Sequence, residues 1–295
     1  MQSEQMSGKI CLVTGGSSGI GKAAALELAQ RGAHVVIVAR DPERTEQAAE
    51  EIRRTSDNHR VEAIRADLSV QQQVRDLAAQ IIQRYPRLDV LVNDAGVYLS
   101  RRQLTPDGME MTLAVQYLAP FLLTNLLRDL LVRSAPARIV NVSSIFHHLG
   151  RINFDNLQGE RSYEGTLAYA QSKVAVILFT RELARRLAGT GVVVNSMEPG
   201  AVATRIGRSA PLYFQLSFGL LWPVLRSPAE GARTIVHLAC APEVAAVSGR
   251  HFVDCRERTP APVARDDALA ECLWAVSEQL TGLREAPLRE REVGS

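Results

Sequence analysis

Short apolar runs alternate with longer segments of helical spacing along most of this chain. The runs are rich in Val and Ile with few alternating polar residues, which is typical of strands that are covered on both faces. Their alternation with helices predicts an α/β fold, in which a doubly wound parallel sheet of about seven strands carries helices on both faces. The predicted strands are 9–14, 34–39, 60–66, 88–93, 137–143, 192–197 and 251–254, and the predicted helices include 23–30, 44–54, 72–85 and 165–187.

The chain has 295 residues, of which 46% are hydrophobic and 22% are charged, so it can bury one large core. We find no linker and no repeat, and we expect a single domain over residues 1–258. The alternation ends after Thr259, so residues 259–295 are expected to form an extension with one helix through Leu280 and a flexible last dozen residues. The net charge of +2 gives no electrostatic argument for a nucleic acid partner.

The four cysteines are scattered and form no C-x-x-C pair, and the polar N-terminus has no secretory signal. A reducing compartment, the cytoplasm, is therefore expected. No metal-ligand spacing occurs among the Cys and His residues, so we expect no metal site. His147 and His148 are adjacent, which puts side chains on opposite sides of most local structures and favours loop residues over ligands.

Residues 209–225 form the one membrane-like stretch, because they carry no charge. A spanning helix needs about 20 mostly apolar residues, whereas this stretch is shorter and is interrupted by Pro211, Gly219 and Pro223. We therefore expect no transmembrane segment. We interpret residues 206–226 as a segment that covers a substrate pocket, with peripheral membrane contact as the alternative.

A glycine-rich loop lies between the first predicted strand and the first predicted helix. Its glycines allow a tight turn and a close approach of a pyrophosphate to backbone N–H groups, and the helix N-terminus supplies a partial positive charge. In this position the loop predicts a dinucleotide site. Its predicted cofactor-binding residues are Gly15, Ser17, Ser18, Gly19, Ile20 and Gly21.

The second predicted strand ends in a basic residue, Arg40. An Asp or Glu there would accept hydrogen bonds from a ribose 2′-OH and favour NAD, whereas a basic residue pairs with a 2′-phosphate. Arg40 therefore favours NADP. Asp41 is the nearest acid, and we expect it to cap the next helix because Pro42 follows it.

Six motifs in order over residues 9–205 resemble those of the short-chain dehydrogenase/reductase family. They are the loop as TGxxxGxG, Asp67-Leu68, Asn93-Asp94-Ala95-Gly96 as NNAG, Ser144 ending VNVSS, Tyr169 to Lys173 as YxxxK, and Pro199-Gly200. The resemblance implies a Rossmann fold with a nicotinamide cofactor. It also implies that the cofactor contacts Asp67, Leu68, Asn93, Ala95, Gly96, Tyr169, Lys173, Pro199, Gly200, Val202 and Thr204.

Three longer segments, HHLGRINFDNLQ, LAYAQSKVAVILFTRELARRL and SGRHFVDC, are similar to the retinol dehydrogenase branch of that family. The similarity runs over about residues 8–283. Members that act on retinoids are often attached to membranes through an N-terminal hydrophobic segment, which this sequence lacks, so it resembles a soluble relative and a retinoid substrate does not follow. Family members commonly form dimers or tetramers, so a homodimer or homotetramer is expected.

Tyr169 and Lys173 are four residues apart, which places them on one face of a helix. A free tyrosine titrates near pH 10, and a nearby ammonium together with an oxidised nicotinamide should lower that pKa. We expect Tyr169 to act as general acid/base on the substrate oxygen while hydride is transferred, and Ser144 to hydrogen-bond the same oxygen. Lys173 is also expected to hold the nicotinamide ribose.

Two other residues compete for these roles. Tyr163 has Leu167 rather than a lysine four positions later. Ser143 faces the opposite side of its strand from Ser144, and the family pattern uses the second serine.

Two positions depart from the family pattern. Gln116 stands where the family has an Asn that completes a proton relay. Pro120, four residues later, has no N–H to bond the Gln116 carbonyl, so this carbonyl is expected to hold a water. Gln116 is therefore included among the predicted catalytic residues. Asp94 replaces the second Asn of NNAG, and its carboxylate must find donors or stay protonated. Glu198 either selects a polar substrate group or faces solvent.

The sequence thus predicts an NADP-dependent oxidoreductase that interconverts a lipophilic alcohol with its aldehyde or ketone. The alternative is a cofactor-binding non-redox enzyme or regulatory protein on the same scaffold, which Gln116 and Asp94 motivate.

Overall fold

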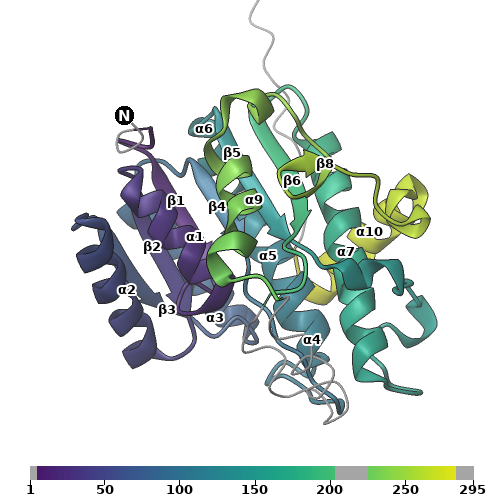
Figure 1. Cartoon of the computed structure of the whole chain (residues 1–295). Coiled ribbons are helices and arrows are strands. Elements are labelled where there is room, and N and C mark those ends of the chain that lie inside the picture. Colours follow the sequence, from purple (N-terminus) through teal and green to yellow (C-terminus); the bar gives the residue numbers. More distant parts are fainter. Residues whose placement is uncertain (1–4, 203–224, 284–295) are drawn as a thin grey trace, which may run out of the picture.

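An eight-stranded sheet in the order β3-β2-β1-β4-β5-β6-β7-β8 forms the centre of the computed structural model, which describes residues 5–202 and 225–283 (Figure 1). Strands β1 to β7 pair in parallel. The predicted doubly wound single-domain fold is therefore confirmed. The strands are β1 Ile10–Thr14, β2 His34–Ala39, β3 Val61–Arg65, β4 Val90–Asn93, β5 Ala137–Val142, β6 Val192–Glu198, β7 His251–Val253 and β8 Arg256–Glu257.

The eighth strand was not expected from the sequence. It runs antiparallel to β7, because the chain reverses at Asp254 and Cys255, whose φ angles are 52° and 59°. A two-residue reversal with both φ angles positive is the geometry of a tight hairpin, which glycine and asparagine favour. An Asp-Cys pair gives only a weak turn signal, so the hairpin could not be read from the residues.

Helices cover both faces of the sheet. One face carries α1 Gly19–Gln30, α2 Pro42–Ser56 and α9 Pro228–Cys240 around one apolar cluster, and Figure 1 shows α1 beside α9. The other face carries α3, α5 and α7, with α10 packed on α7, around a second cluster. These elements and their short neighbours are α3 Gln71–Arg84, α4 Met111–Leu113, the π-helix η1 Ala114–Leu118, α5 Ala119–Leu126, α6 Arg128–Arg133, α7 Gly165–Arg186 and α10 Asp267–Thr281.

The helix after the predicted boundary at Thr259 belongs to this second cluster. Trp274 of α10 lies with its ring 4.8 Å from that of Phe121, and the hydroxyls of Tyr117 and Ser277 are 2.6 Å apart. The expected helix through Leu280 is confirmed as α10, and it packs as part of the core. The last dozen residues, Thr204 and most of the expected covering segment lie outside the described residues.

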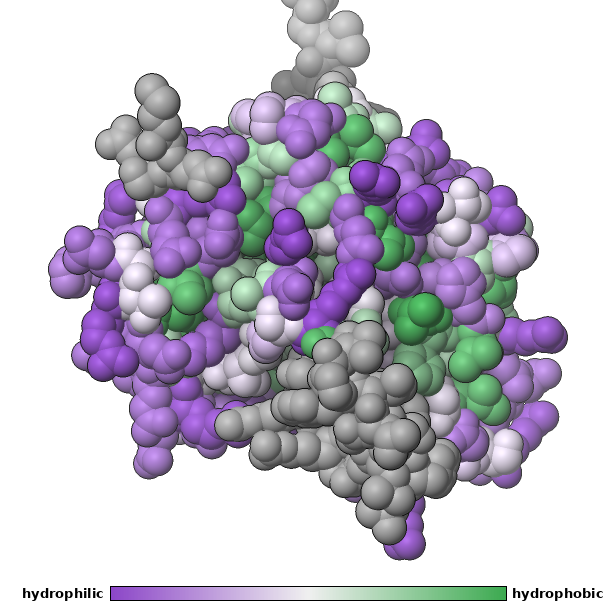
Figure 2. Space-filling model, viewed as in Figure 1, coloured by the Kyte–Doolittle hydropathy of each residue, from purple (hydrophilic) through white to green (hydrophobic). Residues whose placement is uncertain are grey.

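Polar positions follow the carboxyl ends of the central strands at one edge of the sheet. Register places Thr14 of β1 beside Asn93 of β4, and Val142 of β5 beside Met197 of β6. In open parallel sheets this edge is where ligands bind. On the side viewed in Figure 2, apolar residues are scattered among hydrophilic ones, as on an ordinary domain surface.

Candidate active site

The glycine-rich loop lies against the segment that follows β4. Gly15 and Gly19 have φ angles of 74° and 60°, which other residues rarely adopt. A Cβ on Gly15 would lie 3.0 Å from the Ala95 Cα, and one on Gly21 would lie 2.6 Å from the Asp94 Oδ2. The loop can therefore pass this close to its neighbour only without side chains, which leaves its backbone free to face a ligand.

A cavity of about 600 Å³ opens between this loop and the ends of β2, β3 and β4. Its size and glycine-built floor fit a dinucleotide. It is lined by ten of the predicted cofactor residues, namely Gly15, Ser17, Ser18, Gly19, Ile20, Arg40, Asp67, Leu68, Ala95 and Gly96. Asp41 also reaches the cavity, but its carboxylate accepts a hydrogen bond from the Arg44 N–H at 3.1 Å, which confirms the expected helix cap.

Not every predicted cofactor residue lines this cavity. The Asn93 amide instead donates to Asn141 (2.8 Å) and Thr124 (3.2 Å), so this side chain joins β4 to β5 and α5. Gly21 packs behind the loop. Pro199, Gly200 and Val202 follow β6, where Val202 bridges to Arg226.

Three of the four predicted catalytic side chains come together beside the cavity. Ser144 is the second residue after β5, and its hydroxyl is close enough to that of Tyr169 on α7 to lower the pKa of the tyrosine. The Lys173 Nζ lies 5.3 Å from the centre of the Tyr169 ring and donates to the Val142 carbonyl at 3.1 Å. Gly150 lets the segment after Ser144 pass close to α7, because a Cβ at position 150 would lie 2.4 Å from the Ala170 carbonyl of that helix.

Burial opposes charge on these groups. It raises the pKa of Tyr169 to about 12, with the Ser144 hydrogen bond lowering it and the Asp94 charge raising it further. Desolvation thus outweighs any effect of the Lys173 ammonium alone, whereas the predicted lowering rests on that ammonium together with an oxidised nicotinamide. Burial lowers the pKa of Lys173 to about 8, against the attraction of Asp94.

Asp94, the departure from NNAG, is partly buried and is influenced by the charge of Lys173. Burial raises the pKa of Asp94 to about 7, while the Lys173 charge and a hydrogen bond from the Gly21 N–H lower it. The carboxylate therefore finds one backbone donor at the start of α1, as well as a charged partner.

The competing Ser143 and Tyr163 are committed to structural contacts. Ser143 donates to the Lys173 carbonyl at 2.9 Å. The Tyr163 hydroxyl bonds to the Leu99 carbonyl and the Glu110 carboxylate, each at 3.2 Å. These contacts support the choice of the other serine and the other tyrosine.

Gln116 lies in the π-helix, and its side chain reaches α7. Its Nε2 donates to the Ser172 hydroxyl at 3.0 Å, and that hydroxyl donates to the Tyr169 carbonyl at 2.6 Å. Gln116 thus contacts the turn of α7 that separates Tyr169 from Lys173. Its buried Oε1 has no hydrogen-bond partner in the part of the chain that the structure describes.

Sequence reasoning missed several residues of the site. The rings of Tyr98 and Phe146 lie 5.9 and 5.6 Å from that of Tyr169 and form its walls. Arg44 lines the cavity with Arg40, and its place in the first turn of α2, four residues on, was the available signal.

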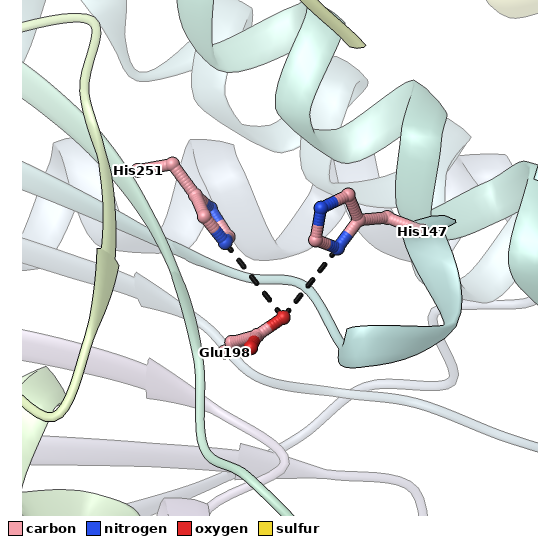
Figure 3. Close-up of side chains that lie close together, drawn as sticks. All are labelled: His147, Glu198 and His251. Atoms are coloured by element: carbon pink, nitrogen blue, oxygen red, sulfur yellow. Dashed lines mark ion pairs between the residues drawn. The ribbon is translucent and has the colours of Figure 1, made fainter. Parts of the chain in front are cut away.

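The structure corrects the reading of Glu198 and of the two adjacent histidines. Glu198 is 7% exposed, so it does not face solvent, and it lies between His147 and His251 (Figure 3). Burial alone would raise the pKa of Glu198, but the two imidazoles lower it to about 2. The rings of His147 and His148 are 4.0 Å apart in a 3₁₀ turn, Ile145–His148, rather than on opposite sides.

In the described ranges no helix is both long and apolar enough to cross a bilayer.

Comparisons with known proteins agree with this site. The family model described as short chain dehydrogenase matches residues 9–211. Human retinol dehydrogenase 13 is 44% identical over 290 residues, covering 96% of this chain and 88% of the relative. Human retinol dehydrogenase 11 is 45% identical over 279 residues, covering 95% and 87%.

Solved structures show the same fold. An uncharacterised protein from Mycobacterium paratuberculosis has a TM-score of 0.76 at 31% identity, covering 94% of each chain. The NADP complex of RhlG from Pseudomonas aeruginosa has a TM-score of 0.69 at 29% identity, covering 92% of this chain and 100% of the other. The motifs, the sheet and these similarities show that the chain belongs to the short-chain dehydrogenase family, in its retinol dehydrogenase branch, and is an oxidoreductase of alcohol and carbonyl groups.

Proposed function

We propose that this protein is an NADP-dependent oxidoreductase that interconverts a lipophilic alcohol with its aldehyde or ketone. The observation that carries the proposal is the convergence of Ser144, Tyr169 and Lys173, with the Lys173 ammonium 5.3 Å from the tyrosine ring, beside a dinucleotide-sized cavity. A hydroxyl that can exchange a proton, a second hydroxyl and a cation in one buried place fit acid–base catalysis on a carbonyl oxygen.

The cavity supports NADP through its charge. Arg40 and Arg44 both line it, whereas Asp41, the nearest acid, is engaged as the cap of α2. Guanidinium groups bind a phosphate through charge-assisted hydrogen bonds, so the two arginines favour a 2′-phosphate over a bare ribose.

The chain's own residues supply the proton transfer. When bound, the nicotinamide gives or takes the hydride. Tyr169, whose pKa is about 12, is protonated at neutral pH, which is the form that donates a proton to a carbonyl oxygen during reduction. The Ser144 hydroxyl orients that oxygen, and the Lys173 ammonium stabilises the phenolate that remains.

The walls of the site support a lipophilic substrate. Tyr98 and Phe146 flank the Tyr169 ring, and Ile145, which follows Ser144, is 54% exposed. These groups offer apolar surface next to the reacting hydroxyl, so an alkyl or aryl chain gains free energy there by leaving water. The cytoplasmic location and the homodimer or homotetramer stay predictions, which fractionation and light scattering would check.

The test is NADPH oxidation, followed at the nicotinamide absorbance, with a panel of medium-chain aldehydes, ketones and retinal. We expect turnover with NADPH well above that with NADH. Tyr169→Phe should abolish it, whereas Tyr163→Phe, which removes a hydroxyl bonded to Glu110, should leave it within a few-fold.

A second candidate is the non-redox nucleotide-binding protein, which the departure at Asp94 favours, because it adds an acid whose charge acts on the lysine needed for chemistry. Tight NADPH binding without oxidation across the panel would support it and refute the oxidoreductase.

A further inference from the structure

Three ligand-type side chains from distant parts of the sequence meet behind the Ser144 turn. His147 comes from that turn, Glu198 ends β6, and His251 begins β7. Their exposed fractions are 1%, 7% and 3%. Figure 3 shows both imidazole rings directed at the Glu198 carboxylate. The cluster is thus a buried convergence of two imidazoles and one carboxylate.

One atom of each residue lacks a partner. The His147 Nε2, the Glu198 Oε2 and the His251 Nε2 are buried and have no hydrogen-bond partner among the residues that the structure describes. The Glu198 Oε2 and the His251 Nε2 approach each other at 3.8 Å, which is longer than a hydrogen bond. Buried polar atoms without hydrogen bonds cost free energy, and a cation bound between these side chains would satisfy them.

The Nδ1 atoms of the two rings have different roles in the cluster. The His147 Nδ1 lies 2.8 Å from the Ser144 carbonyl, and the His251 Nδ1 lies 3.0 Å from the Ser196 hydroxyl. The bond at the His251 Nδ1 is of the kind that orients an imidazole to bind a metal through its Nε2, whereas the His147 Nδ1 faces Glu198 and would leave the Ser144 carbonyl to bind one. The Ser144 carbonyl also accepts from the His147 backbone N–H at 3.0 Å, so it keeps a donor if the ring turns.

The spacing of the atoms fits a small cation. The Glu198 Oε2 lies 3.4 Å from the His147 Nδ1 and 3.8 Å from the His251 Nε2, and one ligand atom from each residue lies within 4.8 Å of the other two. Zinc bonds of about 2.0–2.1 Å in tetrahedral geometry place ligands roughly 3.4 Å apart. Shifts of less than about 1 Å close the set.

We propose that His147, Glu198 and His251 bind a divalent transition metal of the zinc class. Two imidazoles and one carboxylate suit zinc better than magnesium or calcium, which prefer oxygen ligands. The metal would tie the Ser144 turn to the ends of β6 and β7. It is a structural tie, because the reacting hydroxyl of Tyr169 is on α7.

Metal binding can be measured without any redox assay, so its failure is distinguishable from failure of the proposed oxidoreductase. The full chain, carrying Cys272→Ser to remove an exposed thiol, is stripped with a chelator and titrated with Zn²⁺ and with Co²⁺. We expect one equivalent bound with micromolar or tighter Kd, a visible Co²⁺ spectrum of low-coordinate type, and a higher Tm.

Two ligand variants and two controls sharpen the test. Glu198→Gln and His251→Gln should weaken binding by at least about 100-fold. His148→Gln removes the neighbouring imidazole, and His237→Gln removes a histidine that pairs with Glu243 at 3.6 Å nearer the surface; both should bind like the parent.

Either of two results would overturn the proposal. One is that the stripped parent chain takes up no stoichiometric metal, which needs no variant. The other is that a folded His251→Gln protein, checked by circular dichroism, binds as tightly as the parent.

Discussion

The two halves of the sheet edge are built by different means. Around β1 to β4 the cavity is made by backbone, since Gly15, Gly19 and Gly21 are needed for the side chains they lack. Around β5 to β7 the site is made by buried charged side chains, such as Lys173 and Glu198. A backbone-built site tolerates many sequences but no added atoms, whereas a side-chain-built site depends on each functional group.

The largest effect that tests this comparison is expected from substitutions at two neighbouring serines. Ser144→Ala should lower kcat by about 100- to 1,000-fold, because it removes a donor aimed at the reacting oxygen. Ser143→Ala removes a bond to the Lys173 carbonyl and should cost about 1 kcal/mol of stability with kcat nearly unchanged.

Steady-state kinetics and urea unfolding on both variants provide the measurement. If Ser143→Ala proved the slower enzyme, the assignment of the catalytic serine would be wrong.

In the backbone-built half, adding one methyl group should weaken cofactor binding, just as removing a functional group should lower activity in the side-chain-built half. Gly21→Ala places a Cβ against the Asp94 carboxylate and the Gly15 carbonyl, and overpacking of this kind costs about 1–3 kcal/mol. We expect NADPH affinity to fall by about 10- to 100-fold.

Fluorescence titration with NADPH measures this loss. Gly108→Ala is the control, because its Cβ meets nothing within 4 Å and only its φ of 77° is strained. Equal affinities for NADPH in the two variants would contradict the close-approach argument.

A smaller effect should separate the two cofactors. Arg40→Ala removes a charge-assisted hydrogen bond worth about 1.5–3 kcal/mol, so NADPH affinity should fall at least about tenfold while NADH affinity stays the same. Arg54→Ala, near the other end of α2, should change neither.

Isothermal titration calorimetry with NADPH and with NADH measures the two affinities for each variant. A parallel loss of NADH affinity would show that Arg40 does not read the 2′-phosphate.

The smallest effect concerns Asp94, a charged side chain that the backbone-built half places next to the glycine loop. The pKa of Asp94 is raised in the fold to about 7, so the folded chain binds an extra proton between about pH 4 and 7, and stability falls as the pH rises through this window. Asp94→Asn should remove that fall, and be more stable at pH 8 by about 1–2 kcal/mol but not at pH 4.

Urea unfolding at pH 4 and at pH 8 measures the sign of the change in the free energy of unfolding. Asp89→Asn is the matched control with the opposite outcome, because the Asp89 carboxylate accepts bonds from Lys9, Arg87 and the Ile10 N–H and its loss should destabilise. A destabilised Asp94→Asn protein would mean that the attraction of Lys173 outweighs the burial of its charge.

The same contrast explains how much could be predicted from the sequence. The strands, the main helices and the cap at Asp41 follow from local patterns, and the structure confirms them. The glycine loop is contiguous, so its residues could be named one by one. Tyr169 and Lys173 could be named because helix geometry relates positions four apart.

Contacts between distant segments could not be read in this way. His147, Glu198 and His251 have no spacing that links them, because their meeting depends on the pairing of β6 with β7 and on the turn after β5. The effect of burial on the pKa of Tyr169 could not be predicted either, since a sequence shows a neighbouring charge but not the depth of burial.

Helix α10, the last helix of the described residues, completes the packing around the helix that carries Tyr169. It covers α7, and Trp274 stacks under the Arg186 guanidinium at 4.1 Å. Ribosomes add about 5–20 residues per second, so α7 emerges on the order of ten seconds before the helix that covers it. The strands and helices before α7 can fold on the nascent chain during that interval, whereas the core around α7 stays incomplete until α10 has been made. A newly made molecule is therefore expected to complete the part of the fold around the glycine loop before the part around Tyr169.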